Sequence, residues 1–313
     1  MSNAASESRP AASAGGATLV GLVAVLMWAL LATLTTWTGD VPPLLLNALA
    51  FTVASVIGIA WVLMGDGPRG FGAILRQPWP VWLLGVGGLF GYHAMYFTAL
   101  KLAPPVEASL IAYLWPLLIV LFSALLPGEA LRSNHIVGAV LGFLGAGLIV
   151  MRAGEGADGR VLEAGFDADY TLGYLAALTC ALIWSGYSVL SRLARSVPTQ
   201  AVAGFCIATA VLSFALHLVF EETVWPQGLG AWLAVLALGL GPVGGAFYVW
   251  DWGCKRGDIK VLGAASYAAP VLSTLVLVLA GQARLTAGVV LACALVTLGA
   301  VVASWQMLRG RSG

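Results

Sequence analysis

The chain has 313 residues, of which 60% are hydrophobic and only 9% are charged, and its formal net charge is +1. Soluble domains carry about 25% charged residues, so this composition excludes an ordinary soluble enzyme. The near-zero net charge also provides no basic surface for nucleic acid. The four cysteines form no C-x-x-C pair and no histidines are paired with them, so we expect neither a metal site nor a disulfide framework. These features predict an all-α integral membrane protein.

Ten apolar segments follow one another along the chain, and each is long enough for a membrane-spanning helix of about 20 residues. An Ala/Ser/Gly-rich stretch at 1–16 precedes them and is expected to be a disordered tail. A polar stretch at 152–169, expected to be a periplasmic loop, divides them into a first unit at 17–151 and a second unit at 170–308. A cytoplasmic tail at 309–313 ends the chain. The predicted spans are 17–37, 43–64, 78–100, 104–126, 134–151, 170–192, 198–219, 230–252, 260–280 and 286–308.

Lysine and arginine are distributed unevenly between the loops. If the N-terminus is inside, eleven of these residues lie on the cytoplasmic side and four on the outside. Cytoplasmic loops carry the excess of positive charge. We therefore expect a multi-pass protein of the bacterial inner membrane, with both termini in the cytoplasm and the lipid bilayer as its surroundings.

The second unit repeats the first when the sequence is shifted by 154 residues. Gly91 then meets Gly245, Lys101 meets Lys255, and the offset holds without a gap for some 60 residues. Five spans per unit is an odd number, so the two units must cross the membrane in opposite senses. Such inverted repeats are typical of secondary transporters that work by alternating access around a central site. The sequence thus predicts two inverted five-helix repeats around a central cavity.

Several short aromatic motifs carry a family resemblance. They are Tyr113-Leu-Trp-Pro116, Trp184-x-x-Tyr187, Trp250-x-x-Gly253 and Ser266-Tyr-x-x-Pro270. With the repeat, these motifs resemble the drug/metabolite transporter superfamily, whose members with two EamA-type halves have ten helices in inverted five-helix repeats. The resemblance covers nearly the whole chain and implies an exporter of aromatic amino acids.

Polar and aromatic side chains at helical spacing mark the candidate cavity, because lipid-facing positions favour leucine instead. His93 is a candidate substrate ligand, although a structural role bonded across helices is equally open. Pro116 and Pro270 fall inside predicted spans, where each frees the carbonyl four residues before it; they are candidate kink and gating positions. The candidate substrate-binding residues are Tyr92, His93, Tyr96, Tyr113, Trp115, Trp184, Tyr187, Phe247, Trp250 and Tyr267.

The cargo and its coupling follow from what the spans lack. No lysine or arginine lies in mid-span, which disfavours phosphorylated substrates, whereas aromatic rings suit a bulky side chain and attract an ammonium group. We expect export of aromatic and other bulky neutral amino acids by a monomer without a cofactor.

Neither a nucleotide-binding loop nor a hydrolase motif is present, so we expect no enzyme. The first span has no acidic residue, and Glu107 and Asp251 lie near span ends where solvation is expected; facilitated diffusion is therefore favoured. The alternative is proton-coupled efflux of hydrophobic drugs or cationic metabolites.

Overall fold

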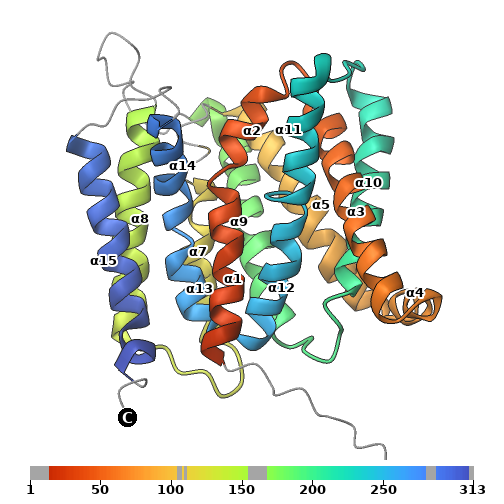
Figure 1. The fold of residues 1–313 in the computed structure, drawn as a ribbon. Coiled ribbons are helices and arrows are strands. Elements are labelled where there is room, and N and C mark those ends of the chain that lie inside the picture. The colour runs from red at the N-terminus through yellow and green to blue at the C-terminus, as the bar shows by residue number, and fades with distance from the viewer. Residues whose placement is uncertain (1–13, 104–107, 109–110, 154–167, 280–286, 310–313) are drawn as a thin grey trace, which may run out of the picture.

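The computed structural model describes residues 14–103, 108, 111–153, 168–279 and 287–309, and every regular element among them is helical. Most of the predicted tails and of the predicted polar loop lie outside these residues. Figure 1 shows the helices standing roughly side by side. In the first half of the chain they are α1 (Ala14–Trp28), α2 (Leu31–Trp37), α3 (Pro43–Gly65), α4 (Pro68–Leu75), α5 (Trp79–Leu102), α7 (Trp115–Ser123) and α8 (Ser133–Ala153).

The second half begins with a short 3-10 turn (Ala168–Tyr170). Its helices are α9 (Thr171–Ser191), α10 (Ala201–Phe220), α11 (Gly228–Leu240), α12 (Gly245–Arg256), α13 (Ile259–Ala265), α14 (Ala268–Leu279) and α15 (Ala287–Arg309). On one face, which we call the terminal face, α1 and α8 begin and α15 ends, whereas α2 and the start of α11 lie on the opposite face (Figure 1).

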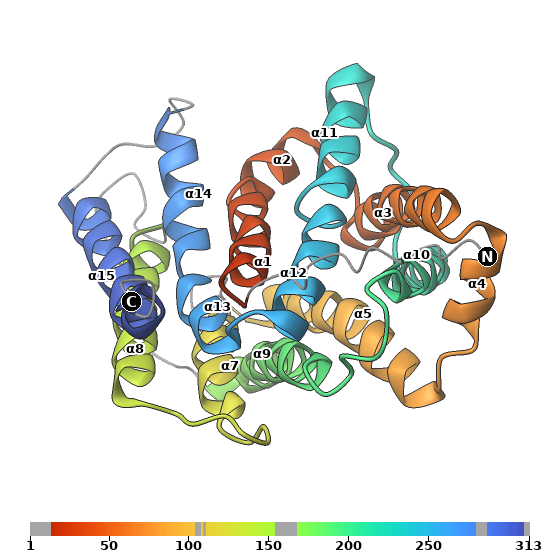
Figure 2. The ribbon, with the colours of Figure 1, turned by 60° about the horizontal axis from the view of Figure 1, so that its bottom comes forward.

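Helices from the two halves of the chain pack against each other in pairs. The most extensive contacts join α8 with α15, α5 with α9, α3 with α10, and α1 with α12. Figures 1 and 2 both place α8 and α15 at one edge and α3 and α10 near the other. Small residues allow the close approach: a Cβ added to Gly138 on α8 would lie 2.5 Å from the carbonyl oxygen of Gly299 on α15. The core therefore forms between the halves of the chain.

Several of the apolar segments are interrupted rather than continuous. Span 17–37 divides into α1 and α2, and span 260–280 contains α13 and α14. Span 230–252 was predicted as one helix, but it breaks between α11 and α12 at the sequence Gly-Pro-Val-Gly-Gly. Proline and glycine both disfavour a helix interior. A Cβ added to Gly244 would lie 1.6 Å from the carbonyl oxygen of Gly239, so this turn requires glycine.

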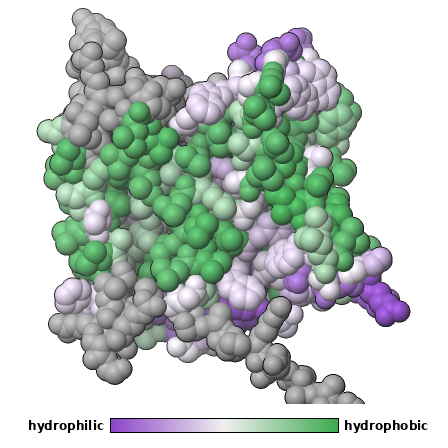
Figure 3. Space-filling model, in the orientation of Figure 1, coloured by the Kyte–Doolittle hydropathy of each residue, from purple (hydrophilic) through white to green (hydrophobic). Residues whose placement is uncertain are grey.

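The outer surface exposes many large hydrophobic side chains, as expected for a surface in contact with lipid. Leu182, Val211, Leu229 and Leu298 are exposed, together with many other large hydrophobic side chains. In Figure 3 hydrophobic residues cover much of the described middle of the visible face, and hydrophilic ones gather toward its upper and lower edges. By length and composition, α3, α9, α10 and the stretch Gly228–Arg256 can each cross a membrane, and four further apolar helices are shorter. The count of ten spans stays a prediction.

Candidate functional site

A cavity of about 480 Å³ lies where the broken helices meet near the middle of the molecule. It reaches from buried aromatic side chains to the connection between α2 and α3 on the opposite face, where Thr38 and Gly39 also border a second hollow. None of the described lining residues is Asp, Glu, Lys or Arg. The lining residues are Trp28, Leu31, Thr35, Thr38, Gly39, Val41, Pro43, Leu46, Asn47, Ala50, Tyr92, His93, Tyr96, Phe97, Ala112, Tyr113, Trp115, Trp184, Leu238, Pro242, Val243, Phe247 and Ala269.

Four tryptophans from four helices form one group, which we call the tryptophan cluster: Trp28, Trp115, Trp184 and Trp250. All six pairs have ring centroids between 5.0 and 6.3 Å apart. Trp28 and Trp115 meet edge to face at 84°, a geometry that the ring quadrupoles favour by about 0.5–1.5 kcal/mol per pair. The first three line the cavity, and Trp250 lies fully buried behind them. The cluster therefore forms a closely packed aromatic wall.

The indole N–H groups of this cluster divide into two kinds. Trp28 donates to the carbonyl of Pro242 and Trp250 donates to the hydroxyl of Ser188, both at 3.0 Å. Within the described parts of the chain, the N–H groups of Trp115 and Trp184 have no acceptor, and both side chains line the cavity. Because an indole nitrogen only donates, these two groups are unpaired donors in a wall that also carries hydroxyl, amide and imidazole groups.

One face of α5 supplies the other aromatic side of the cavity. Tyr92 and Tyr96 stack at 5.9 Å with an angle of 5° between their rings, as residues one turn apart on a helix can. His93 Nδ1 lies 2.7 Å from the carbonyl oxygen of Leu89. A carbonyl only accepts, so Nδ1 carries the hydrogen and the neutral ring keeps Nε2 as an acceptor. This bond lies within α5, but the ring also packs edge to face against Phe51 on α3 and Phe247 on α12, so the choice between a substrate ligand and a structural role stays a prediction.

Seven of the ten candidate binding residues line the cavity, and three do not. Tyr187 is buried against Gly88, where an added Cβ would touch its ring, and Trp250 is held by Ser188. Tyr267 is fully buried, and its hydroxyl accepts a bond from the backbone N–H of Leu117 at 3.1 Å. The residues that line the cavity are Tyr92, His93, Tyr96, Tyr113, Trp115, Trp184 and Phe247.

The two prolines lie in first turns rather than in helix interiors. Pro116 is the second residue of α7 and Pro270 the third of α14. A first turn tolerates proline because its N–H groups have no partner within the helix. The Ser266 carbonyl, expected to be free, accepts a bond from the N–H of Ala269 at 3.1 Å. Both prolines thus mark helix starts beside the cavity.

Asp251 corrects an expectation. It was expected to be solvated at a span end, but it is only 2% exposed, and its carboxylate lies 2.8 Å from the ammonium of Lys255, itself 3% exposed. Lys255 also donates to the carbonyl of Val197 at 3.0 Å. Burial of both charges is sustained by these bonds. Glu107 lies outside the described residues.

Sequence reasoning missed part of the cavity wall. Trp28 ends α1, and it meets Trp184 at an offset of 156, close to the 154 of the repeat, which was a usable signal for it. Asn47 is the single amide of α3 and donates to the Ser213 hydroxyl at 2.8 Å. Phe97 and Pro242 also line the cavity, and no local pattern distinguishes them from packing residues.

Comparisons with known proteins identify the family of this chain. A model of the EamA-like transporter family matches residues 16–151 and again residues 171–305. The chain belongs to the EamA-like transporter family. The aromatic amino acid exporter YddG of Ancylobacter novellus is 58% identical to this EamA-like chain over 93% of it and 98% of the exporter's length. The pseudopaline exporter CntI of Pseudomonas aeruginosa is 29% identical over 54% of this chain and 55% of its own length. A solved crystal structure with a TM-score of 0.86 and 56% identity covers 95% of this chain and 99% of that one.

Proposed function

We propose that this EamA-like protein exports aromatic and other bulky neutral amino acids across the bacterial inner membrane. The observation that carries the proposal is the central cavity, whose wall is aromatic and whose described lining residues hold no fixed charge. Its volume of about 480 Å³ lies within the range of about 300–1,000 Å³ found for small-molecule sites. The 58% identity to an aromatic amino acid exporter supports the same cargo.

The wall can meet each part of a zwitterionic substrate. The open indole N–H groups of Trp115 and Trp184 would donate to the carboxylate. His93 Nε2 and the faces of Tyr92 and Tyr96 would meet the ammonium, since a ring face attracts a cation. The aromatic side chain would stack in the remaining space. An uncharged wall favours a cargo without net charge, because a buried unpaired charge is costly.

Transport by alternating access is the mechanism that this architecture favours. The two family matches cover corresponding halves of the chain. The packing pairs also correspond: α1 pairs with α12 as α9 pairs with α5, which relates the first and third helices of each half. This arrangement supports ten spans in two inverted repeats, divided as 17–151 and 170–308. The excess of lysine and arginine supports a cytoplasmic terminal face, and a cavity completed within one chain supports a monomer.

Facilitated diffusion is the favoured mode of coupling. Proton-coupled exchange of the kind expected for hydrophobic drugs or cationic metabolites uses titratable side chains inside the membrane, such as carboxylates or histidines. The described part of the cavity wall has no carboxylate, and the buried Asp251 is already paired with Lys255. His93 is the single histidine among the described lining residues.

The test is uptake of labelled phenylalanine by proteoliposomes preloaded with unlabelled phenylalanine, with and without an imposed pH gradient. We expect counterflow that does not respond to the gradient and that tryptophan and tyrosine inhibit. Lipophilic cations as the stronger competitors, together with flux that follows the gradient, would favour the drug-efflux alternative instead. Absence of flux from folded protein would refute the amino acid cargo.

A further inference from the structure

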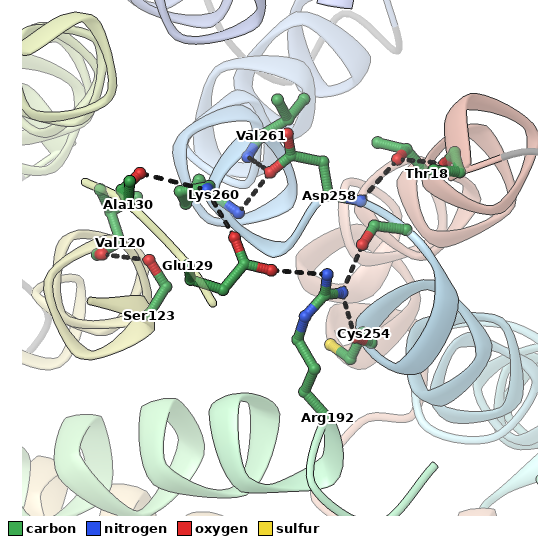
Figure 4. A network of polar contacts seen from close by, with 12 residues as sticks. Thr18, Val120, Ser123, Glu129, Ala130, Arg192, Cys254, Asp258, Lys260 and Val261 are labelled. Atoms are coloured by element: carbon green, nitrogen blue, oxygen red, sulfur yellow. Dashed lines mark hydrogen bonds and ion pairs between the residues drawn. The ribbon is translucent and has the colours of Figure 1, made fainter. Parts of the chain in front are cut away.

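A charge network on the terminal face is centred on Glu129, which lies between α7 and α8 (Figure 4). Its Oε1 accepts a hydrogen bond from Arg192 at 2.7 Å, and its Oε2 accepts one from Lys260 at 2.6 Å. Arg192 directly follows α9, and Lys260 is the second residue of α13. One carboxylate therefore connects the ends of two helices that are 68 residues apart in the chain.

The same network extends to the end of α12 and the start of α1. Arg192 also donates to the backbone carbonyls of Cys254, at 3.2 Å, and Gly257. Asp258 caps α13 with its carboxylate, and its own N–H donates to the hydroxyl of Thr18 at 2.8 Å. Figure 4 shows these groups converging from several helices. The network thus holds helix ends from both halves of the chain together.

The position of this charge network relative to the cavity suggests its role. The cavity extends from the tryptophan cluster toward the opposite face, where Thr38 and Gly39 line it. The tryptophan cluster and Cys254 belong to the same hydrophobic core, and the carbonyl of Cys254 is bonded to Arg192 of the network. Glu129 belongs to the first family match, whereas Arg192 and Lys260 belong to the second. A movement that opens the cavity to the terminal face must separate these helix ends and therefore break the network.

We propose that Glu129 is a latch that holds the cavity closed on the terminal face and is released whenever the cavity opens there. The proposal rests on the alternating access of the proposed function. The side chains of Glu129, Arg192 and Lys260 keep 18%, 14% and 10% of their surface exposed. Water can therefore replace the broken bonds, which makes the latch reversible. A fully buried pair such as Asp251 and Lys255 has no such exchange.

Cys254 provides a native reporter for this latch. Its thiol is buried, its carbonyl is bonded to Arg192, and it lies at the end of α12 that would move. Cys206 on α10 is equally buried, is hydrogen-bonded to Tyr248 rather than to the network, and reports general unfolding. Reaction of purified full-length protein with a charged maleimide, followed by peptide mass spectrometry, measures both thiols in one sample.

We expect Glu129→Gln to increase the labelling rate of Cys254 by about tenfold, because two charge-assisted bonds are weakened, while Cys206 stays protected. Lys260→Gln should give a smaller increase, and Glu222→Gln, an exposed acid outside the network, should give none. Labelling of Cys254 at the wild-type rate in both network variants would overturn the latch. So would equal labelling of Cys254 and Cys206, which would show that the network supports the whole fold. No substrate is required, so the outcome does not depend on whether phenylalanine is the cargo.

Discussion

Replacing Trp184 or Trp250 by phenylalanine separates substrate binding from packing, because the two positions differ in the use of the indole N–H. The rings have centroids 6.3 Å apart and both are at least 97% buried, so the substitution removes a similar ring volume at each. Trp184 lines the cavity, and its N–H has no acceptor among the described residues. In Trp250 it donates to Ser188 at 3.0 Å.

The expected magnitudes differ accordingly. A hydrogen bond to a charged group contributes about 1.5–3 kcal/mol, so loss of the Trp184 donor should weaken the apparent affinity for phenylalanine by about tenfold to a hundredfold. Loss of the Trp250 bond removes an interhelical hydrogen bond, worth about 0.6 kcal/mol on average and up to about 1.7 within membranes. Trp250→Phe should therefore lower thermal stability beyond the effect of Trp184→Phe and leave the affinity near that of the wild type.

The assay combines counterflow at varied phenylalanine concentration with thermal unfolding of the same purified preparations. Trp28→Phe provides a further control, because its N–H is used by the Pro242 carbonyl although its ring lines the cavity. Equal affinity in the wild type and Trp184→Phe would refute the role of this N–H in binding the carboxylate. Equal loss of affinity in Trp184→Phe and Trp250→Phe would show that ring packing alone explains the effect.

Three further predictions concern stability. Burial raises the pKa of Glu129, but the hydrogen bonds and positive charges of Lys260 and Arg192 lower it by a larger amount. The pKa of Glu129 therefore lies below its usual value. The stabilisation by Glu129 is therefore complete above the ordinary carboxyl pKa of about 4.3, and it is lost as the pH falls through the lower pKa of Glu129 in the folded protein. The melting temperature of Glu129→Gln should not show this loss at acid pH. Asp251→Asn leaves the Lys255 ammonium without its carboxylate and should destabilise by about 3–5 kcal/mol, and a melting temperature like that of the wild type would contradict the buried pair. Gly138→Ala forces a methyl group against a carbonyl of α15 and should cost about 1–3 kcal/mol, whereas Gly186→Ala on α9 meets open space and should stabilise by up to about 1 kcal/mol; the opposite signs are read from the same melting curves.

The sequence predicted the helical class and much of the aromatic wall, because both depend on local properties. Apolar segments of membrane length and aromatic residues spaced by one helical turn, such as Tyr92 and Tyr96, can be recognised without knowing the packing. The family match supports the resemblance that these motifs suggested.

The remaining features depend on contacts between distant segments. Tyr267 and Trp250 resemble the cavity residues in sequence, but one bonds to the backbone of α7 and the other to α9, so both lie behind the wall. Asp251 is buried because Lys255 lies one turn away and faces the same side. Glu129 gave no signal in the sequence, since its role depends on two cations from the other half of the chain.

The central claim is that bulky neutral amino acids cross the membrane through the aromatic cavity. The most direct measurement compares counterflow of labelled phenylalanine in proteoliposomes that contain equal amounts of wild-type protein, Trp115→Ala or Tyr92→Ala. We expect clear exchange by the wild type and a severe loss in both variants, because each removes part of the wall that holds the substrate. Wild-type flux in the folded variants would contradict the cavity as the substrate site, and no flux in the wild type would contradict the proposed cargo.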